Sequence, residues 1–148
     1  MIVENHQIAY RNVASKLYNF LPEEIDIALN DFDEILTGHG YHPTGAIFFS
    51  IISDPTAEVM TAQLFLPIAE SLFSFPNDEE VNFSSYFIVD KLIMTRITEE
   101  YEVQSQVKYW ELFSYLKEHN MTQKTPVFVQ FKKTQSNRTY AEMSLGVL

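Results

Sequence analysis

The sequence predicts a single α+β domain made of two copies of a strand–helix–strand–strand unit, an antiparallel sheet with two helices packed on one face. The 148 residues are 46% apolar and 14% aromatic, which suffices for one packed core but is little for two independent ones. Segments with a two-residue hydrophobic period alternate with segments of helical period. Elements of the same type also recur in the same order about 80 residues apart, as expected for an internal repeat.

The first half of the chain contains every element of this unit. Alternation over about 8–17 predicts a strand, and Pro22 followed by acidic residues predicts the start of a helix. Gly38 and Gly40 are expected to end that helix. Gly/Pro punctuation and apolar runs then predict a strand, a turn and a partner strand at about 44–53, 54–55 and 57–68.

The second half repeats this order after a polar connector at 74–85. We therefore expect one domain of two pseudo-repeats, at about 1–73 and 81–148. Tyr109 and Trp110 lie on or beside the apolar stripe of the second helix, where core packing is expected. The predicted strand, helix, strand and strand cover about 86–98, 105–119, 126–133 and 138–148.

Direct alignment of the halves supports the repeat. The segment 62–68 aligns with 141–147 at an offset of 79, and 13–17 aligns with 93–97 at an offset of 80. Matches between the two helices fall at an offset of 80 as well. They pair Ile27, Phe32 and Leu36 with Val107, Leu112 and Leu116.

Charge and composition exclude several classes of partner and location. The net charge of −10 and the lack of any basic run beyond Lys132-Lys133 argue against binding to nucleic acid or to anionic membranes. Cysteine is absent, which excludes disulfides and thiolate chemistry. The first residues do not resemble a signal peptide and no apolar stretch is long enough to span a bilayer, so a cytoplasmic location is expected.

No pattern in the sequence indicates catalysis, a cofactor or a metal. Nucleophile elbows, phosphate-binding loops and dinucleotide fingerprints are missing, and only four glycines are available to build one. His39 and His42 have the spacing of helical metal ligands, but Gly40 and Pro43 place them in a turn. We expect a non-enzymatic protein in which these are ordinary loop histidines.

Strand alternation identifies a candidate binding face. In the last strand Met143 and Leu145 share one face, whereas Glu142 and Ser144 lie on the other. Gln63 holds the matching position in the first half, so both polar side chains are expected to point away from the helices. Two further strands are apolar on both faces, so their second face must be covered by a ligand, a partner subunit or the connector.

The segments Leu64–Ile68 and Ala141–Leu148 resemble strand endings of the GyrI-like family, which includes effector-binding domains of AraC-type and MerR-type transcription regulators. The resemblance covers nearly the whole chain in topology and rests on short motifs. Gly146 stands where the family has a second proline, and Ala141 where it has a threonine. The resemblance implies a ligand cleft between the repeats, with Glu142 contacting the ligand.

On this resemblance we expect a non-catalytic module that holds a small, partly apolar ligand. A carboxylate among aromatic rings also suits a cation. The alternative is that Glu142 forms an ion pair with Lys132 or Arg96. The candidate ligand-binding residues are Glu142, Gln63, Phe65, Tyr140, Tyr86 and Phe48.

A second hypothesis is a protein-interaction role. The chain is also similar to an uncharacterised Bacillota family of about 150 residues that is associated with type VII secretion and polymorphic-toxin loci. That resemblance implies an accessory protein or inhibitor whose open sheet face binds a protein partner, and the acidic charge suits a basic one. A symmetric homodimer through the same face is a third arrangement.

Overall fold

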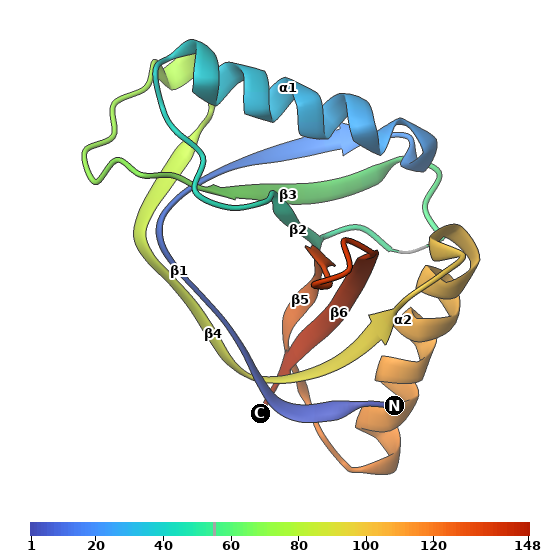
Figure 1. Cartoon of the computed structure of the whole chain (residues 1–148). Coiled ribbons are helices and arrows are strands. Elements are labelled where there is room, and N and C mark those ends of the chain that lie inside the picture. The colour runs from blue at the N-terminus through green and yellow to red at the C-terminus, as the bar shows by residue number, and fades with distance from the viewer. Residues whose placement is uncertain (55) are drawn as a thin grey trace. The chain divides into compact units, whose positions relative to one another are not determined.

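The computed structural model describes residues 1–54 and 56–148, so the predicted turn at 54–55 lies partly outside the described residues. The α+β class is confirmed, and every predicted helix and strand is present (Figure 1). The elements are β1 (Val3–Phe20), α1 (Ile25–Gly38), β2 (Phe48–Ile51), β3 (Met60–Pro67), β4 (Asn82–Ile97), α2 (Tyr101–Glu118), β5 (Gln123–Lys133) and β6 (Thr139–Val147). Single 3₁₀ turns cover Pro22–Glu24 and Asn77–Glu79.

The boundaries differ from the prediction mainly in two strands. The first strand begins at Val3 instead of about residue 8, because the polar residues before Ile8 continue the extended backbone. The second strand is only Phe48–Ile51, shorter than the apolar run that predicted it. The connector contributes its last residues to β4, which starts at Asn82.

The chain forms two compact units. One comprises residues 9–88 and is called here the β1–β3 unit; the other comprises residues 1–8 and 89–148 and is called the β4–β6 unit. The β1–β3 unit has twelve acidic and two basic residues, whereas the β4–β6 unit has eight of each. The whole net charge of −10 therefore lies in the β1–β3 unit.

In the β1–β3 unit, β3 is the central strand. It pairs antiparallel with β1, from Val13↔Pro67 to Phe20↔Met60, and with β2, from Phe48↔Phe65 to Ile51↔Ala62. The helix α1 packs against β3, and its buried residues recur at i, i+4 and i+8, the spacing of one helix face. These residues are Ala28, Phe32 and Leu36.

In the β4–β6 unit, β6 is the central strand and pairs antiparallel with β4 and β5. The helix α2 packs against β6 and buries Leu112 and Leu116. The expectation that Trp110 packs in the core is wrong, because its side chain is 54% exposed. It lies on the opposite side of α2 from the two buried leucines, while Tyr109 is half-buried and contacts the ring of Phe113.

Gly146 explains an irregularity in this second sheet. The pairing of β5 with β6 shifts register between Gln123 and Val127, and the Gly146 N–H donates a hydrogen bond to Thr125 Oγ1 at 2.7 Å. A Cβ at residue 146 would lie 2.7 Å from Thr125 Cγ2. A proline here would lose this donor and meet the same threonine, which accounts for the glycine at this position.

Candidate functional site

Glu142 occupies the middle of the central strand of the β4–β6 unit. Its ladder partners are Arg96 on β4 and Gln130 on β5. The side chain is buried, with only 2% of the residue surface exposed. A carboxylate removed from water in this way must be compensated by charge or hydrogen bonds.

Two cationic side chains supply that compensation, and a histidine lies beside the same carboxylate. Lys132 Nζ lies 2.7 Å from Glu142 Oε1, and Arg96 Nε donates a hydrogen bond to Oε2 at 3.2 Å. His6, from the start of β1, places Nε2 3.7 Å from Oε1. The Arg96 guanidinium also lies over the ring of Tyr140, 5.3 Å from its centroid. Glu142 therefore forms ion pairs with both residues proposed as its alternative partners, Lys132 and Arg96.

Burial and charge act in opposite directions on Glu142. Burial raises the pKa of its carboxyl, but the nearby Lys132, His6 and Arg96 more than offset this, and the pKa lies below its ordinary value. Burial also lowers the pKa of His6; Lys132 and Arg96 add to this effect, while Glu142 opposes it. At neutral pH the group thus contains one carboxylate, two cations and a neutral imidazole.

Two further buried polar atoms, Ser144 Oγ and His6 Nε2, belong to the same unit as this carboxylate. Ser144, two residues along β6 and on the same face as Glu142, is 1% exposed. Among the described residues, neither Ser144 Oγ nor His6 Nε2 has a hydrogen-bond partner. Buried polar groups are nearly always hydrogen-bonded, so these two atoms are exceptions to the usual pairing.

The other predicted site residues lie mostly in the β1–β3 unit. Gln63, which the sequence alignment pairs with Glu142, donates a hydrogen bond from Nε2 to Ser15 Oγ at 3.2 Å. Phe48 and Phe65 stack with their ring centroids 4.9 Å apart, and both are buried. Tyr86 is 58% exposed, and the Arg11 guanidinium lies over its ring. Tyr140 alone shares a unit with Glu142.

Two aromatic side chains not included in the predicted site complete the cluster around Phe48. Tyr10 stacks on Phe48 at 5.1 Å, and Phe87 contacts both Phe48 and Phe65. The β1–β3 unit therefore has an aromatic cluster at the strands where the β4–β6 unit has its charged cluster.

Sequence reasoning missed His6. It precedes the segment predicted as the first strand and is 136 residues from Glu142 along the chain. Residues 4–7 are all polar, so no alternation of polar and apolar residues signals a strand at His6. Alternation places Ser144 on the same face as Glu142, and the two strands that are apolar on both faces indicated that this second face is covered.

In the β1–β3 unit, His39 and His42 follow α1 and make contacts with neighbouring residues. His42 Nδ1 lies 2.6 Å from Glu70 Oε2, and the His42 N–H donates to Oε1 of the same carboxylate. His39 contacts the carbonyl of Ile35 and the ring of Phe75. Within 1–54 and 56–148, no cluster of three or more His, Cys, Asp or Glu side chains has an arrangement that could hold a metal ion.

None of the helices in the part of the chain that the structure describes is both long and apolar enough to cross a membrane.

Comparison with solved structures identifies the fold. The crystal structure of the EcmrR C-terminal domain matches 97% of this chain and 98% of its own, with a TM-score of 0.64 and 9% identity. EcmrR in a cryo-EM complex with DNA matches 99% of this chain, with a TM-score of 0.76 and 12% identity. This chain spans 57% of the EcmrR chain in that complex. At these identities the similarity establishes the fold alone.

The sequence comparisons give a family but no function. No curated protein matches the chain. A family model described as "Domain of unknown function (DUF5085)" matches residues 9–147. The chain is a member of the DUF5085 family.

Proposed function

We propose that this protein is a non-catalytic binding module of GyrI-like type, whose small, partly apolar ligand contacts the charged cluster at Glu142. The observation that carries the proposal is the pairing of a buried carboxylate with three basic groups in a sheet that also holds hydrogen-bonding atoms without partners. Its fold is that of the C-terminal domain of EcmrR. The EcmrR complex with DNA comes from a longer chain, so a role in transcription does not follow for this one.

The charge of the cluster limits the ligand. Lys132 and Arg96 together carry two positive charges, and Glu142 carries one negative charge. The three side chains therefore have a net charge of +1. A cationic group would have to displace one of these side chains from the carboxylate and would meet the other. A ligand with a neutral or anionic polar end can instead accept hydrogen bonds from Lys132 and Arg96, whose side chains are 37% and 60% exposed. These contacts support such a ligand over the cationic one that the sequence also allowed.

Native mass spectrometry of the protein purified gently from its own host tests this proposal. We expect a reproducible small-molecule mass on the wild type that is lost in Arg96→Met and Lys132→Met, the variants that remove the donors to the ligand. Lys133→Met is the matched control, because Lys133 is the exposed neighbour of Lys132 and has no ion pair within the described part of the chain. Protein without any ligand mass, or retention of the mass in both cluster variants, would contradict the proposal.

A panel of defined probes separates the ligand classes without knowledge of the natural ligand. Dodecanoate and dodecyltrimethylammonium have the same alkyl chain and opposite charges. We expect dodecanoate to raise the melting temperature of the wild type more than the trimethylammonium compound, and Lys132→Met to reduce that difference. A stronger effect of the cation would restore the expectation made from the sequence.

We also propose that the two halves of the chain, at about 1–73 and 81–148, arose by duplication. Both halves have the order strand, helix, strand, strand. In each half the last strand, β3 or β6, pairs with the two other strands of that half, which supports the proposal. The ladder partners of Gln63 are Leu17 and Ser50, and those of Glu142 are Arg96 and Gln130. The offsets are 79 for Gln63 to Glu142 and for Leu17 to Arg96, and 80 for Ser50 to Gln130. Superposition of the units in an experimental structure tests it, and a register other than 79–80 would count against duplication.

A further inference from the structure

The outer face of α2 carries large apolar side chains that are about half exposed. Val103 is 61% exposed, Val107 45% and Trp110 54%. Their spacing of i, i+4 and i+7 places them on one stripe, on the opposite side of the helix from the buried Leu112 and Leu116. A helix that is apolar on two sides has one side available for a second packing partner.

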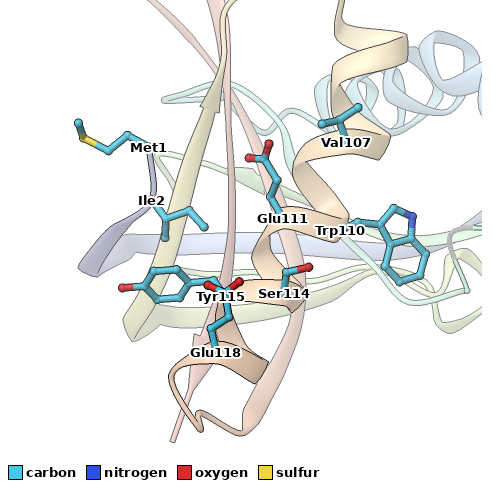
Figure 2. Close-up of a pocket in the computed structure, with 8 residues that line it drawn as sticks. All are labelled: Met1, Ile2, Val107, Trp110, Glu111, Ser114, Tyr115 and Glu118. Atoms are coloured by element: carbon cyan, nitrogen blue, oxygen red, sulfur yellow. The ribbon is translucent and has the colours of Figure 1, made fainter.

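A shallow groove of about 580 Å³ runs along this part of α2. Val107, Trp110, Tyr115 and Glu118 line it from the helix, and Ile2 lines it from the start of the chain, as Figure 2 shows. From Val107 to Glu118, the two ends of the lining, the helix extends roughly 17 Å, or about three turns. That length is greater than a small molecule covers but matches the contact made by a helical polypeptide segment.

Charge along the groove is asymmetric. Glu111 and Glu118 border the apolar stripe on one side, and Glu4 lies beyond them, hydrogen-bonded by the Tyr115 hydroxyl. Lys108 pairs with Glu111 at 3.4 Å, the one ion pair that a carboxylate of this border makes in the part of the chain that the structure describes. The opposite border carries Lys117 and no acidic side chain close to the stripe in the last turns. A complementary helix would therefore carry its Lys or Arg residues along one border of its apolar face.

From these features we infer that the outer face of α2 is a docking groove for an amphipathic helix of another polypeptide, with an apolar stripe bordered on one side by basic residues. Trp110 and Val107 provide the apolar contact, since buried aromatic anchors dominate binding energy at such interfaces. Glu111 and Glu118 determine the orientation of the partner and favour a basic border over an acidic one. This surface is separate from the Glu142 cluster and independent of the ligand proposed there.

Trp110 makes the inference directly measurable, because it is the only tryptophan of the chain. The probe is an 18-residue helical peptide without tryptophan, with a leucine stripe bordered on one side by lysines and otherwise alanine and glutamine. We expect it to shift Trp110 emission to shorter wavelength in a saturable, salt-sensitive titration. The same peptide with glutamate in place of lysine should bind at least about tenfold more weakly, as like charges oppose each other across the border.

Variants locate the binding to the groove. Val107→Asp should weaken binding at least about tenfold, because it places a charge under an apolar contact. Glu111→Gln with Glu118→Gln should remove most of the salt dependence and the preference for lysine over glutamate. The matched control is Ile27→Asp, which changes an equally exposed apolar residue of α1 in the unit that carries the whole net charge. We expect this control to leave the titration unchanged.

Four results would overturn the inference. These are no emission change with the lysine peptide, equal binding of both peptides, equal weakening by Ile27→Asp and Val107→Asp, or a dimer in sedimentation that Val107→Asp makes monomeric. The last would assign the groove to a second copy of this chain. All the substituted side chains are exposed, and far-UV circular dichroism of each variant verifies that α2 remains folded.

Discussion

Lys132 and Glu142 form the shortest ion pair at the buried carboxylate, with Nζ 2.7 Å from Oε1. The lysine is partly exposed while the glutamate is not, so the two partners lose different amounts of hydration on folding. Removal of one partner therefore has a different cost from removal of the other.

We predict that Lys132→Met destabilises the protein by about 1–3 kcal/mol. Loss of one partner from a buried pair costs about 3–5 kcal/mol, and the partial exposure of Lys132 together with the remaining Arg96 reduces this. Urea unfolding at pH 7.5 measures the change. The double variant Lys132→Met with Glu142→Gln should be less destabilised than the sum of the single variants, and strict additivity would show that the two side chains do not interact.

Stability is predicted to fall as the pH falls below about 6.5, through the imidazole of His6. Its pKa is lowered in the folded protein, so the unfolded chain binds more protons between the ordinary value of 6.5 and the folded value. Stability that is present above pH 6.5 is therefore lost as the pH falls through this interval. Glu142, whose pKa is also lowered, adds a further loss below its ordinary value of 4.5.

Urea unfolding of wild type and His6→Gln at pH 7.5, 6.5 and 5.5 measures this effect. The variant should show a smaller decrease in the free energy of unfolding over this range than the wild type. His39→Gln is the control, since His39 is an exposed histidine of the turn that follows α1. An unchanged slope in His6→Gln would show that other groups cause the acid sensitivity.

Gly146→Ala is predicted to destabilise the protein by about 1–3 kcal/mol, the usual cost of an overpacked site. The added Cβ would meet Thr125 Cγ2 at 2.7 Å, far inside normal contact distance. Thr125→Ser removes this methyl group and should recover part of the loss in the double variant. Thermal unfolding measures both. Gly38→Ala is the control, because no atom lies within 4 Å of a Cβ there, and it should be neutral or slightly stabilising.

Phe32→Ala should lower the free energy of unfolding by about 3–5 kcal/mol, because the Phe32 ring is fully buried. The ring also lies edge-on to that of Tyr18, with the two ring centroids 6.1 Å apart. Ile27→Ala on the same helix should change stability by less than about 0.5 kcal/mol, since Ile27 is 64% exposed. Chemical denaturation of both variants measures the difference. Similar costs for the two would indicate that α1 does not pack through the face containing Ala28, Phe32 and Leu36.

Local patterns were enough to predict the elements and their order. Alternation identified the strands, helical spacing placed Phe32 and Leu36 inward, and glycine, proline and acidic residues marked the ends of α1. These signals act within a few residues along the chain, so no tertiary information is needed to interpret them. Alternation also placed Glu142 and Ser144 on one face of the last strand.

The tertiary structure decided which side chains meet. His6 reaches Glu142 although 136 residues separate them, and no short-range pattern encodes that contact. Trp110 was expected inside because it lies on or beside the apolar stripe of α2, but burial depends on what packs against each side of the helix, and the side that carries Trp110 is left about half exposed. Composition gave the charge of −10, whereas only the division into units showed that all of it belongs to residues 9–88. Periodicity is a property of neighbouring residues, while contact and burial depend on strand register and helix packing, which bring distant residues together.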